Sequence, residues 1–390
     1  MNKILERGVE EIIDKRHLEE SLKRGDKLRV KLGIDPTAKD LHLGHTIVLR
    51  KLRQFQDTGH QAVLIIGDFT AAIGDPSGRN ELRPPLTSEQ IKENMRNYLR
   101  EVGKVLDIKK TEVHHNSEWY KDKDLNFLME LASKFTITRL LERDDFQKRL
   151  KEGMDVSLVE ILYPIIQGYD SLAINADLEL GGTDQKFNLL MGRKVQKRYN
   201  QPEQDILTVP LIEGLDGTKK MSKSTGNYIG LSESSRDIFG KIMSLPDSLM
   251  VKYFTLLTDV PEEEISKLKS DLTNPSSAKK SPKEWKEKLA SEIVRMYCSQ
   301  EEAVIVKDEF TRIFSGRQLP DKIGEYYLQD GDTIVDVITK RGLAGSKTEA
   351  KRLVDQKAVE VNNEKLSDWG YKVKEGDVIK VGPRKFLKIV

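Results

Sequence analysis

Short apolar segments alternate with longer segments of helical periodicity through the first half of the chain. The clearest apolar segments are residues 28–32 and 63–66, and turn-forming glycine and proline follow both. Helical periodicity extends over residues 49–58, 88–106 and 124–151. This alternation predicts an α/β fold with a doubly wound, parallel sheet. Ligands bind such sheets at the carboxyl ends of the strands, so the loops after the strands are the expected place for chemistry.

The pattern changes twice further along the chain. Residues 206–212 have the composition of a late strand of the same sheet, and a polar loop rich in Gly, Lys and Ser follows over residues 213–226. From about residue 232 to residue 314 the periodicity is helical, and beyond residue 318 the composition changes again. We therefore predict three domains: an α/β domain over residues 1–230 that opens with helices over residues 1–24, a helical domain over residues 231–320 and a small α+β domain over residues 330–390.

Composition limits the class of protein. The chain has 390 residues, more than a single core usually supports, and a formal net charge of only +2. Its one cysteine, Cys298, cannot form an internal disulfide, and no Cys/His cluster has zinc spacing. The sequence has no run of about eighteen apolar residues and no apolar leader at its N-terminus. We expect a soluble, cytoplasmic protein with no membrane segment and no structural metal.

Residues 31–45 (KLGIDPTAKDLHLGH) predict a strand, a tight turn and a helix that begins near Asp40 as its N-cap. His42 and His45 are three residues apart and so share one face of that helix. Gly44 between them leaves room for a ligand against the backbone. A helix N-terminus of this kind suits phosphate, although two histidines there could also form an ordinary surface cap.

The loop 217–226 (GTKKMSKSTG) carries the second candidate group. Lys220 and Lys223 lie beside hydroxyls and glycines, as needed to surround a triphosphate whose charge must be neutralised. A solvated basic turn is the alternative for these lysines alone. Two such patterns in order, each at a predicted strand end, favour a nucleotide site with a mobile loop.

A polar stripe interrupts an otherwise apolar segment. Tyr163, Gln167 and Asp170 are spaced at i, i+4 and i+7, so on a helix they form one face. Buried polar groups need partners, which indicates either an internal hydrogen-bond network or a pocket for a small amphipathic ligand. Pro164 predicts that the helix begins near it or bends there.

The tail combines a basic helix with short strands. A helix is predicted from Ser346, with strands over residues 359–361, 378–381 and 386–390. Residues 332–390 hold 13 Lys/Arg and 9 Asp/Glu, a net of +4 by subtraction. Such a surface suits nucleic-acid phosphates, and a solvated charged face is the alternative. The candidate RNA-binding residues are Lys347, Lys351 and Arg352.

These motifs together resemble a known family. HLGH at 42–45 and KMSKS at 220–224 resemble the two signatures of class I aminoacyl-tRNA synthetases. The tyrosyl-tRNA synthetase family is similar in GIDPT at 33–37, GDPSGR at 74–79, GGTDQ at 181–185 and the Tyr163 stripe, and the tail resembles the S4 RNA-binding module. The resemblance implies a Rossmann-like catalytic domain, a helical anticodon-binding domain and an S4-like domain, within the three boundaries above.

The resemblance also implies a reaction and its participants. L-tyrosine and ATP would give tyrosyl-adenylate and pyrophosphate, and the tyrosine would pass to tRNA(Tyr). Mg²⁺ would accompany the nucleotide, and the protein would be a homodimer. Catalysis would fall to His42, His45, Lys220 and Lys223. The residues implied to bind ATP are Gly33, Asp35, Thr37, Gly44, Arg79, Arg83, Gly182, Asp184, Leu211, Ile212, Met221 and Ser224.

The implied tyrosine site contains one departure from part of the family. Its residues are Lys31, Asp75, Tyr163, Gln167, Asp170 and Gln185, with Asp170 at the substrate phenol. One branch of the family has a tyrosine where this sequence has Lys31. That lysine could pair with Asp170, reach the phenol or occupy a strand edge.

Three other readings remain open from the sequence. A tryptophan-specific relative is disfavoured by the S4-like tail, the DPT turn and Asp170. A non-catalytic RNA-binding homologue would tolerate decay of HLGH or KMSKS, and both are intact. A nucleotidylyltransferase with the same histidine motif would not need the helical and S4-like domains.

Overall fold

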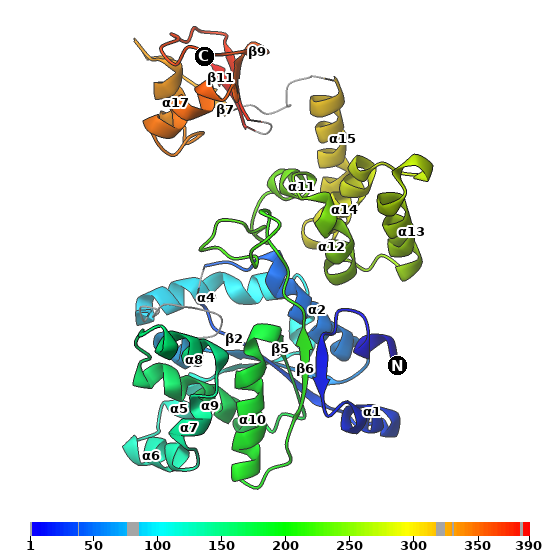
Figure 1. The fold of residues 1–390 in the computed structure, drawn as a ribbon, viewed down its shortest axis with the longest axis vertical. Helices are drawn as coiled ribbons and strands as arrows, with labels where there is room; N and C mark the ends of the chain where they lie inside the picture. Colours follow the sequence, from blue (N-terminus) through cyan, green and yellow to red (C-terminus); the bar gives the residue numbers. More distant parts are fainter. Residues whose placement is uncertain (1, 38, 76–85, 317–323, 330, 383–384) are drawn as a thin grey trace. The chain divides into compact units, whose positions relative to one another are not determined.

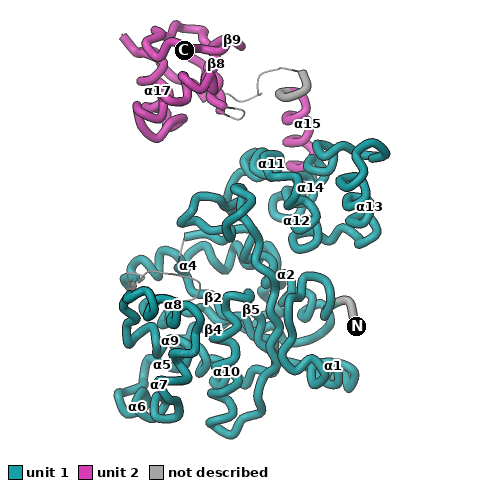
Figure 2. Tube along the Cα trace, in the orientation of Figure 1, with its two compact units in different colours: residues 1–300 teal, residues 301–390 magenta. Residues whose placement is uncertain are grey.

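The computed structural model describes residues 2–37, 39–75, 86–316, 324–329, 331–382 and 385–390 (Figure 1). Within these ranges the chain forms two units, residues 1–300 and 301–390 (Figure 2). Arg79 and Arg83, two of the predicted ATP contacts, lie outside the described residues.

A six-stranded sheet is the centre of the first unit, in the order β1-β6-β5-β2-β3-β4. Its strands are β1 (Glu11–Ile13), β2 (Arg29–Ile34), β3 (Gln61–Ile66), β4 (Glu112–His115), β5 (Leu178–Gly182) and β6 (Asp205–Val209). Five strands are parallel, as the doubly wound pattern predicts, and β1 joins the edge antiparallel to β6. The all-helical prediction for residues 1–24 is therefore wrong, because three of these residues take up the free edge of β6.

The central strands are apolar along their whole length because both faces of the sheet are covered. Val63, Leu64 and Ile65 of β3 are fully buried, as is Val30 of β2. Among the elements flanking the sheet are helices α1 (Lys15–Arg24), α2 (Leu43–Asp57), α3 (Asp68–Ile73), α4 (Ser88–Val102), α5 (Ser117–Tyr120), α9 (Leu158–Ala173) and α10 (Lys186–Arg198).

The structure moves one predicted helix start and divides one predicted helical segment. The helix after the first turn begins after His42 and not after Asp40, because His42 and His45 form a capping box at its N-terminus. The periodic segment 124–151 is three helices, α6 (Leu125–Ser133), α7 (Ile137–Leu140) and α8 (Asp144–Lys151).

Helix α9 runs through Pro164 and starts six residues before it. A capping box between Ser157 and Glu160 fixes this start, and Glu160 also pairs with buried Arg149. The helix therefore carries Tyr163, Gln167 and Asp170 together, as their spacing predicts.

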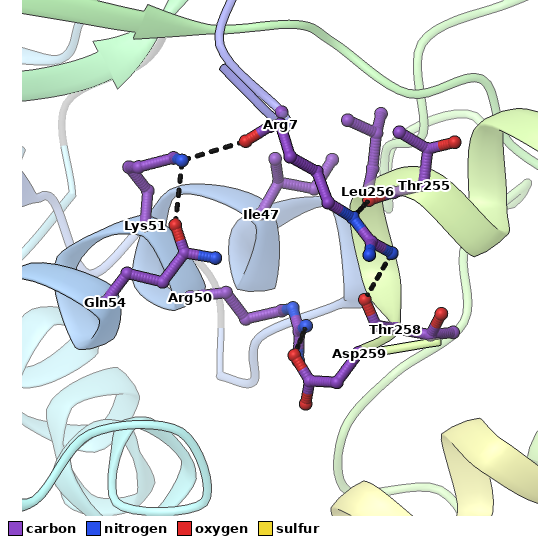
Figure 3. Close-up of a pocket in the computed structure, with 10 residues that line it drawn as sticks. Arg7, Ile47, Arg50, Lys51, Gln54, Thr255, Leu256, Thr258 and Asp259 are labelled. Atoms are coloured by element: carbon purple, nitrogen blue, oxygen red, sulfur yellow. Dashed lines mark hydrogen bonds and ion pairs between the residues drawn. The ribbon is translucent and has the colours of Figure 1, made fainter. Parts of the chain in front are cut away.

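The helical part of the first unit contains α11 (Ser235–Met243), α12 (Met250–Leu257), α13 (Glu262–Thr273) and α14 (Pro282–Tyr297). Arg7 ties the N-terminal segment to it. Its guanidinium donates to the carbonyls of Phe254, Thr255, Thr258 and Val260 at 2.7–3.0 Å. Figure 3 shows the bonds to Thr255 and Thr258. These carbonyls lie at the C-terminus of α12, where backbone acceptors lack helical partners, so Arg7 acts as a cap.

The second unit contains α15 (Gln300–Gly316) and, after it, a small α+β core. Its sheet has the order β7-β11-β10-β8-β9, with strands β7 (Gly324–Tyr326), β8 (Val359–Val361), β9 (Glu364–Lys365), β10 (Val378–Val381) and β11 (Lys385–Ile389). Helices α16 (Ile334–Lys340) and α17 (Lys347–Asp355) share that core, and Ser346 caps α17 as predicted. Across the described residues of both units, no helix is long and apolar enough to span a membrane.

Candidate active site

The N-terminus of α2 holds two histidines whose tautomers are fixed by the backbone. The His42 N–H donates to Nδ1 of His45 at 3.1 Å, and the Gly44 N–H donates to Nδ1 of His42 at 3.2 Å. Because a backbone N–H can only donate, both Nδ1 atoms are acceptors and each ring carries its proton on Nε2. The two rings lie with centroids 3.9 Å apart, so two N–H donors are available side by side.

Both rings are neutral at physiological pH. Burial, followed by the neighbouring His45 and two lysines, lowers the pKa of His42 to about 2. Burial and the same lysines lower the pKa of His45 to about 4. These histidines therefore present hydrogen-bond donors to a ligand and not positive charges.

The positive charges come from the loop that follows β6. Lys220 Nζ lies 2.5 Å from Asp184 Oδ2, and Lys223 Nζ lies 3.3 Å from Asp40 Oδ2. Asp184 is one of the predicted ATP-binding residues. In this conformation its carboxylate is paired with a lysine of the loop. The loop is anchored at its base, where Lys252 of α12 pairs with Glu213 at 2.8 Å.

The predicted adenine and ribose contacts come together around three strand ends. A side chain at Gly44 would lie 3.7 Å from Ile212, and one at Gly182 would lie 3.1 Å from Leu211 and 2.5 Å from Asp184. At Gly44 a side chain would also lie 2.9 Å from the His42 ring, so glycine at both positions lets the neighbouring side chains approach the backbone closely. Met221 is buried and its N–H donates to the Ile212 carbonyl, whereas the Ser224 hydroxyl lies 2.9 Å from that of Ser222.

The turn after β2 carries a buried carboxylate. Asp35 accepts hydrogen bonds from Tyr163 at 2.9 Å and from Thr70 at 2.7 Å, and the Thr37 N–H bonds to its carbonyl. Burial, with a contribution from Asp75 and Asp170, raises the pKa of Asp35 to about 7. Three carboxylates therefore repel one another around Tyr163, which favours binding of a cation there.

Two further predicted residues complete this end of the site. Gln185 Nε2 donates to Asp75 Oδ2 at 2.7 Å. Gln167 lies one turn after Tyr163 on α9, and its Oε1 atom is buried with no hydrogen-bond partner among the described residues. An unpaired buried acceptor costs free energy unless a ligand donor reaches it.

The other end of the stripe holds Asp170, which is 3% exposed. Trp119 Nε1 donates to its Oδ1 at 2.9 Å, and Asn116 Nδ2 lies 3.4 Å from its Oδ2. Burial raises the pKa of Asp170 to about 7, against the lowering effect of Lys31. Sequence reasoning did not identify Asn116 or Trp119, which follow β4 in a segment without a recognisable motif.

Lys31 does not lie at a strand edge, because β2 is inside the sheet. Lys31 forms an ion pair with Glu179 at 2.7 Å and not with Asp170. Glu179 is a third residue of the site that sequence reasoning did not identify.

The basic tail residues lie in the second unit. Lys347 pairs with Asp336 at 2.8 Å, and Lys351 Nζ lies 4.2 Å from the ring centroid of Trp369. Arg352 and Trp369 are exposed. The described surface thus combines cations with an exposed aromatic ring.

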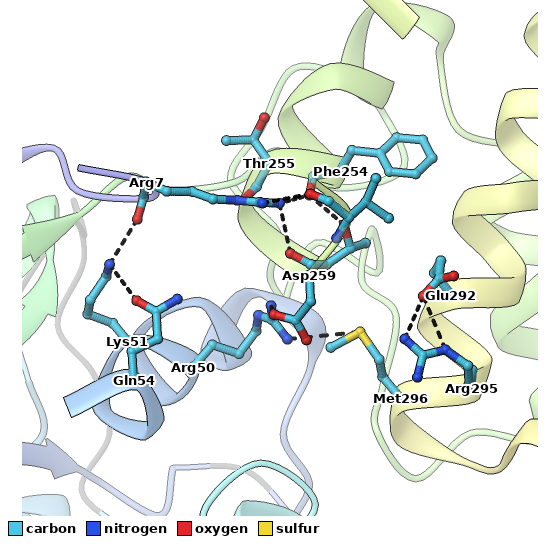
Figure 4. A network of polar contacts seen from close by, with 12 residues as sticks. Arg7, Arg50, Lys51, Gln54, Phe254, Thr255, Asp259, Glu292, Arg295 and Met296 are labelled. Atoms are coloured by element: carbon cyan, nitrogen blue, oxygen red, sulfur yellow. Dashed lines mark hydrogen bonds and ion pairs between the residues drawn. The ribbon is translucent and has the colours of Figure 1, made fainter. Parts of the chain in front are cut away.

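A polar pocket behind α2 does not belong to this site. Arg7, Arg50 and Lys51 line it, together with Asp259. Figure 4 shows that these cations already have partners: Arg50 pairs with Asp259, and Lys51 donates to the Arg7 carbonyl. The pocket is therefore part of the junction between the sheet domain and the helices.

Comparison with known proteins agrees with this arrangement. The family model of class I tRNA synthetases (W and Y) matches residues 23–315, and the S4 domain model matches residues 333–379. The tyrosine–tRNA ligase of Thermotoga maritima is 48% identical over 389 residues, covering 99% of this chain and 96% of the relative. That of Carboxydothermus hydrogenoformans is 49% identical over 400 residues, covering 99% and 97%.

Solved structures show the same fold at lower identity. A C-terminally truncated mitochondrial tyrosyl-tRNA synthetase from Aspergillus nidulans superposes with a TM-score of 0.67 at 23% identity, covering 80% of this chain and 93% of that one. The tyrosyl-tRNA synthetase of Archaeoglobus fulgidus, complexed with L-tyrosine, gives 0.62 at 21% identity, covering 78% and 98%.

Proposed function

Because this chain belongs to the class I tRNA synthetases of the tryptophan and tyrosine family, and its full-length relatives are tyrosine–tRNA ligases, we propose that it ligates tyrosine to tRNA(Tyr). In the first step a carboxylate oxygen of L-tyrosine attacks the α-phosphorus of ATP, and pyrophosphate leaves. In the second step a ribose hydroxyl at the 3′ end of the tRNA attacks the tyrosyl carbonyl, and AMP leaves. Neither step needs a nucleophile from the protein.

The observation that carries the proposal is the polarity of the α9 stripe. Gln167 presents an unpaired buried oxygen, and one turn earlier on α9 Tyr163 donates to the Asp35 carboxylate, an arrangement that suits an ammonium group. At the other end Asp170 is an oriented acceptor, which suits a phenol hydroxyl. Phenylalanine would leave the Asp170 carboxylate without that donor, at a cost of about 1–3 kcal/mol or more for a charged group.

The phosphate end supplies positioning and charge stabilisation. The Nε2–H groups of His42 and His45 would donate to phosphate oxygens in the transition state, and Lys220 and Lys223 would neutralise the departing pyrophosphate. For this the two lysines have to leave Asp184 and Asp40. We therefore propose that ATP binding closes the loop, with the ribose taking the place of Lys220 at Asp184.

We propose that Mg²⁺ enters with the nucleotide. Among the described residues no group of three or more His, Cys, Asp or Glu side chains is placed to hold a metal ion. The phosphate oxygens of ATP would supply the ligands that Mg²⁺ prefers. The cytoplasm, where ATP and tRNA are found together, is the proposed compartment.

The RNA-binding roles extend the same proposal. The helical region 231–320 would contact the anticodon end of the tRNA, and residues 330–390 would bind its backbone through Lys347, Lys351 and Arg352. The exposed cations beside Trp369 support this, because structured RNA is recognised through backbone charge and stacking.

We also propose a homodimer that forms through α6–α9. Several large apolar side chains on these helices are exposed, more than a solvated surface usually shows together. They are Leu125, Met129, Ile137, Leu150, Leu158 and Val159, with exposures of 47–71%. A second copy of the same face would cover them.

The dimer is tested by sedimentation of the Leu125→Asp/Leu158→Asp double variant, which should be a monomer where the wild type is a dimer. Leu99→Asp, at an exposed apolar position of α4, is the control and should leave the dimer intact. A monomeric wild type, or a dimer unaffected by the double variant, would exclude this interface.

The experiment that tests the function is ATP–pyrophosphate exchange with a panel of amino acids. Tyrosine should stimulate exchange, and tryptophan and phenylalanine should not. Stimulation by tryptophan alone would identify a tryptophan-specific enzyme. Absence of exchange with every amino acid, in a protein that still binds tRNA, would instead support the non-catalytic homologue.

A further inference from the structure

A buried lysine lies behind the phenol end of the site. Lys31 of β2 is 0% exposed and stands directly opposite Glu179 of β5 in the parallel pairing. Its Nζ atom lies 2.7 Å from Glu179 Oε1, 2.8 Å from Ser171 Oγ and 3.4 Å from the Gln167 carbonyl. A lysine ammonium has three protons, so all of them have acceptors within the protein. Lys31 is therefore not available to donate to a substrate oxygen.

Glu179 is held as completely as Lys31. Its Oε2 atom accepts from Ser171 at 3.0 Å and from the side-chain amide of Gln204. Helix α10 closes over the pair at Gly192, where a side chain would lie 2.9 Å from both Glu179 Oε2 and Ser171 Oγ. Burying an ion pair has a large desolvation cost, so this pair is weak evidence for added stability. A role in the site would account for it.

The acceptors of Lys31 flank Asp170 on α9. Gln167 precedes it by three residues and Ser171 follows it directly, so Lys31 ties this turn of the helix to the sheet. Within the described residues, Asp170 interacts electrostatically with Lys31 and Glu179 on the strands, with Asp35 after β2, and with Tyr120 and Tyr163 on helices. Trp119 and Asn116 donate to its two oxygens. Lys31 is the cation in this set of interactions, and its positive charge favours the charged form of Asp170.

We propose that Lys31, clamped by Glu179, is a positioning residue for recognition of the tyrosine hydroxyl: it holds the α9 turn and keeps Asp170 a charged, oriented acceptor without touching the substrate. This inference rests on the proposed function. It assigns to a buried Lys–Glu pair the discrimination between tyrosine and phenylalanine.

The charges give a signed test. The ratio of the Kd values for phenylalanine and tyrosine isolates the hydroxyl, because both ligands share the ammonium group, and its pH midpoint reports ionisation of Asp170. Lys31→Met removes the attractive charge and should move that midpoint to higher pH by about one unit or more. Glu179→Gln removes the opposing charge and should move it to lower pH. At pH 7 the ratio should fall about tenfold in Lys31→Met.

Two further variants separate position from folding. Lys31→Met/Glu179→Gln leaves no unpaired buried charge, so it should fold even where Lys31→Met does not, and it should still show a reduced ratio. The matched control is Lys51→Met, which replaces another buried lysine, on α2. This variant should leave the midpoint unchanged. A midpoint that stays fixed in both single variants, or moves the same way in both, would overturn the proposal. Failure of the proposed function would look different, because the wild type itself would then show no tyrosine-dependent exchange.

Discussion

At the scale of single residues, the site depends on buried polar groups whose proton positions are fixed by hydrogen bonds within the fold. The capping box gives His42 and His45 a fixed tautomer, since each Nδ1 receives a backbone N–H. Preorganised donors of this kind need no rearrangement when charge develops on a phosphate. The same two hydrogen bonds that cap the start of α2 therefore orient both imidazole rings.

His45→Ala should therefore lower the rate of ATP–pyrophosphate exchange by about 10²–10³-fold, because one transition-state donor is lost. The Kd for tyrosine should change little, because the partner of His45 is the phosphate. His45→Asn places an acceptor where Nδ1 stood, so it should restore the cap, worth about 1 kcal/mol, without restoring the rate. If either variant mainly lost tyrosine affinity, the phosphate role would be wrong. His114→Ala on β4 is the control.

The pH dependence of tyrosine binding follows from two carboxyls. Burial raises the pKa of Asp35 and that of Asp170 to about 7, far above the unfolded value of 3.8. In the free protein, protonation of these two carboxyls stabilises the folded state at low pH. This stabilisation is lost as the pH rises from about 4 through 7. The ammonium group of tyrosine prefers the carboxylate form of Asp35, and its phenol hydroxyl prefers that of Asp170. The Kd for tyrosine should therefore rise up to about tenfold per pH unit and per group below pH 7. Calorimetry in two buffers at pH 6.5 should show proton release on binding, and a Kd that is constant from pH 6 to 8 would contradict the assignment.

The sequence was sufficient to find the residues that carry motifs. It identified the histidines, the loop lysines and the α9 stripe because each set is local in the chain. It did not identify Asn116, Trp119 or Glu179, which meet Asp170 and Lys31 from other strands and helices. Contacts of this kind depend on strand order, and a single sequence does not report which strands become neighbours.

At the scale of elements, the position of the stripe depends on close packing of α9 and α10. A side chain at Gly168 would lie 2.9 Å from Val195 and 3.1 Å from backbone atoms of α10. The two helices therefore approach as closely as glycine allows. This close packing fixes the position of α9 and of the polar residues that it carries.

Gly168→Ala should destabilise the protein by about 1–3 kcal/mol, because backbone atoms of α10 cannot move aside as a flexible side chain can. Thermal unfolding measures the loss, and tyrosine affinity should fall with it because Gln167 and Asp170 shift. Lys194→Ala on the exposed side of α10 should stay within about 0.5 kcal/mol of wild type. Equal stability of the two variants would show that the helices can separate freely.

Element prediction succeeded where periodicity and capping agreed. The strands at 359–361 and 378–381 and the α17 N-cap are as predicted. β1 was missed because its only signal is its partner β6, about two hundred residues away in the chain. The helical periodicity predicted over residues 124–151 is also confirmed, although the apolar spacing does not mark the breaks between α6, α7 and α8.

At the scale of the whole molecule, the chain joins a catalytic unit to a separately packed tail. The core of the tail is formed by its own helices and strands. Its chemistry is thus separable from that of the site on α2 and α9.

Removal of residues 330–390 should leave tyrosine-dependent exchange nearly unchanged. Charging of tRNA should fall, with kcat/KM for tRNA lowered roughly tenfold or more, equivalent to about 1.4 kcal/mol of lost binding. Exchange and aminoacylation of the same preparation measure the two effects. An equal loss of both activities would show that the tail supports the catalytic unit itself.

The Arg7 cap sets an order of events during synthesis. Arg7 is synthesised before all four of its carbonyl partners, and Val260, the last of them, is made about 250 residues later. At about 5–20 residues per second this interval is roughly 10–50 s. The segment around Arg7 is therefore made well before the carbonyls that it contacts, so the C-terminus of α12 stays uncapped until the two meet. A nascent chain stalled before residue 260 should expose this segment to protease, whereas the released protein should protect it.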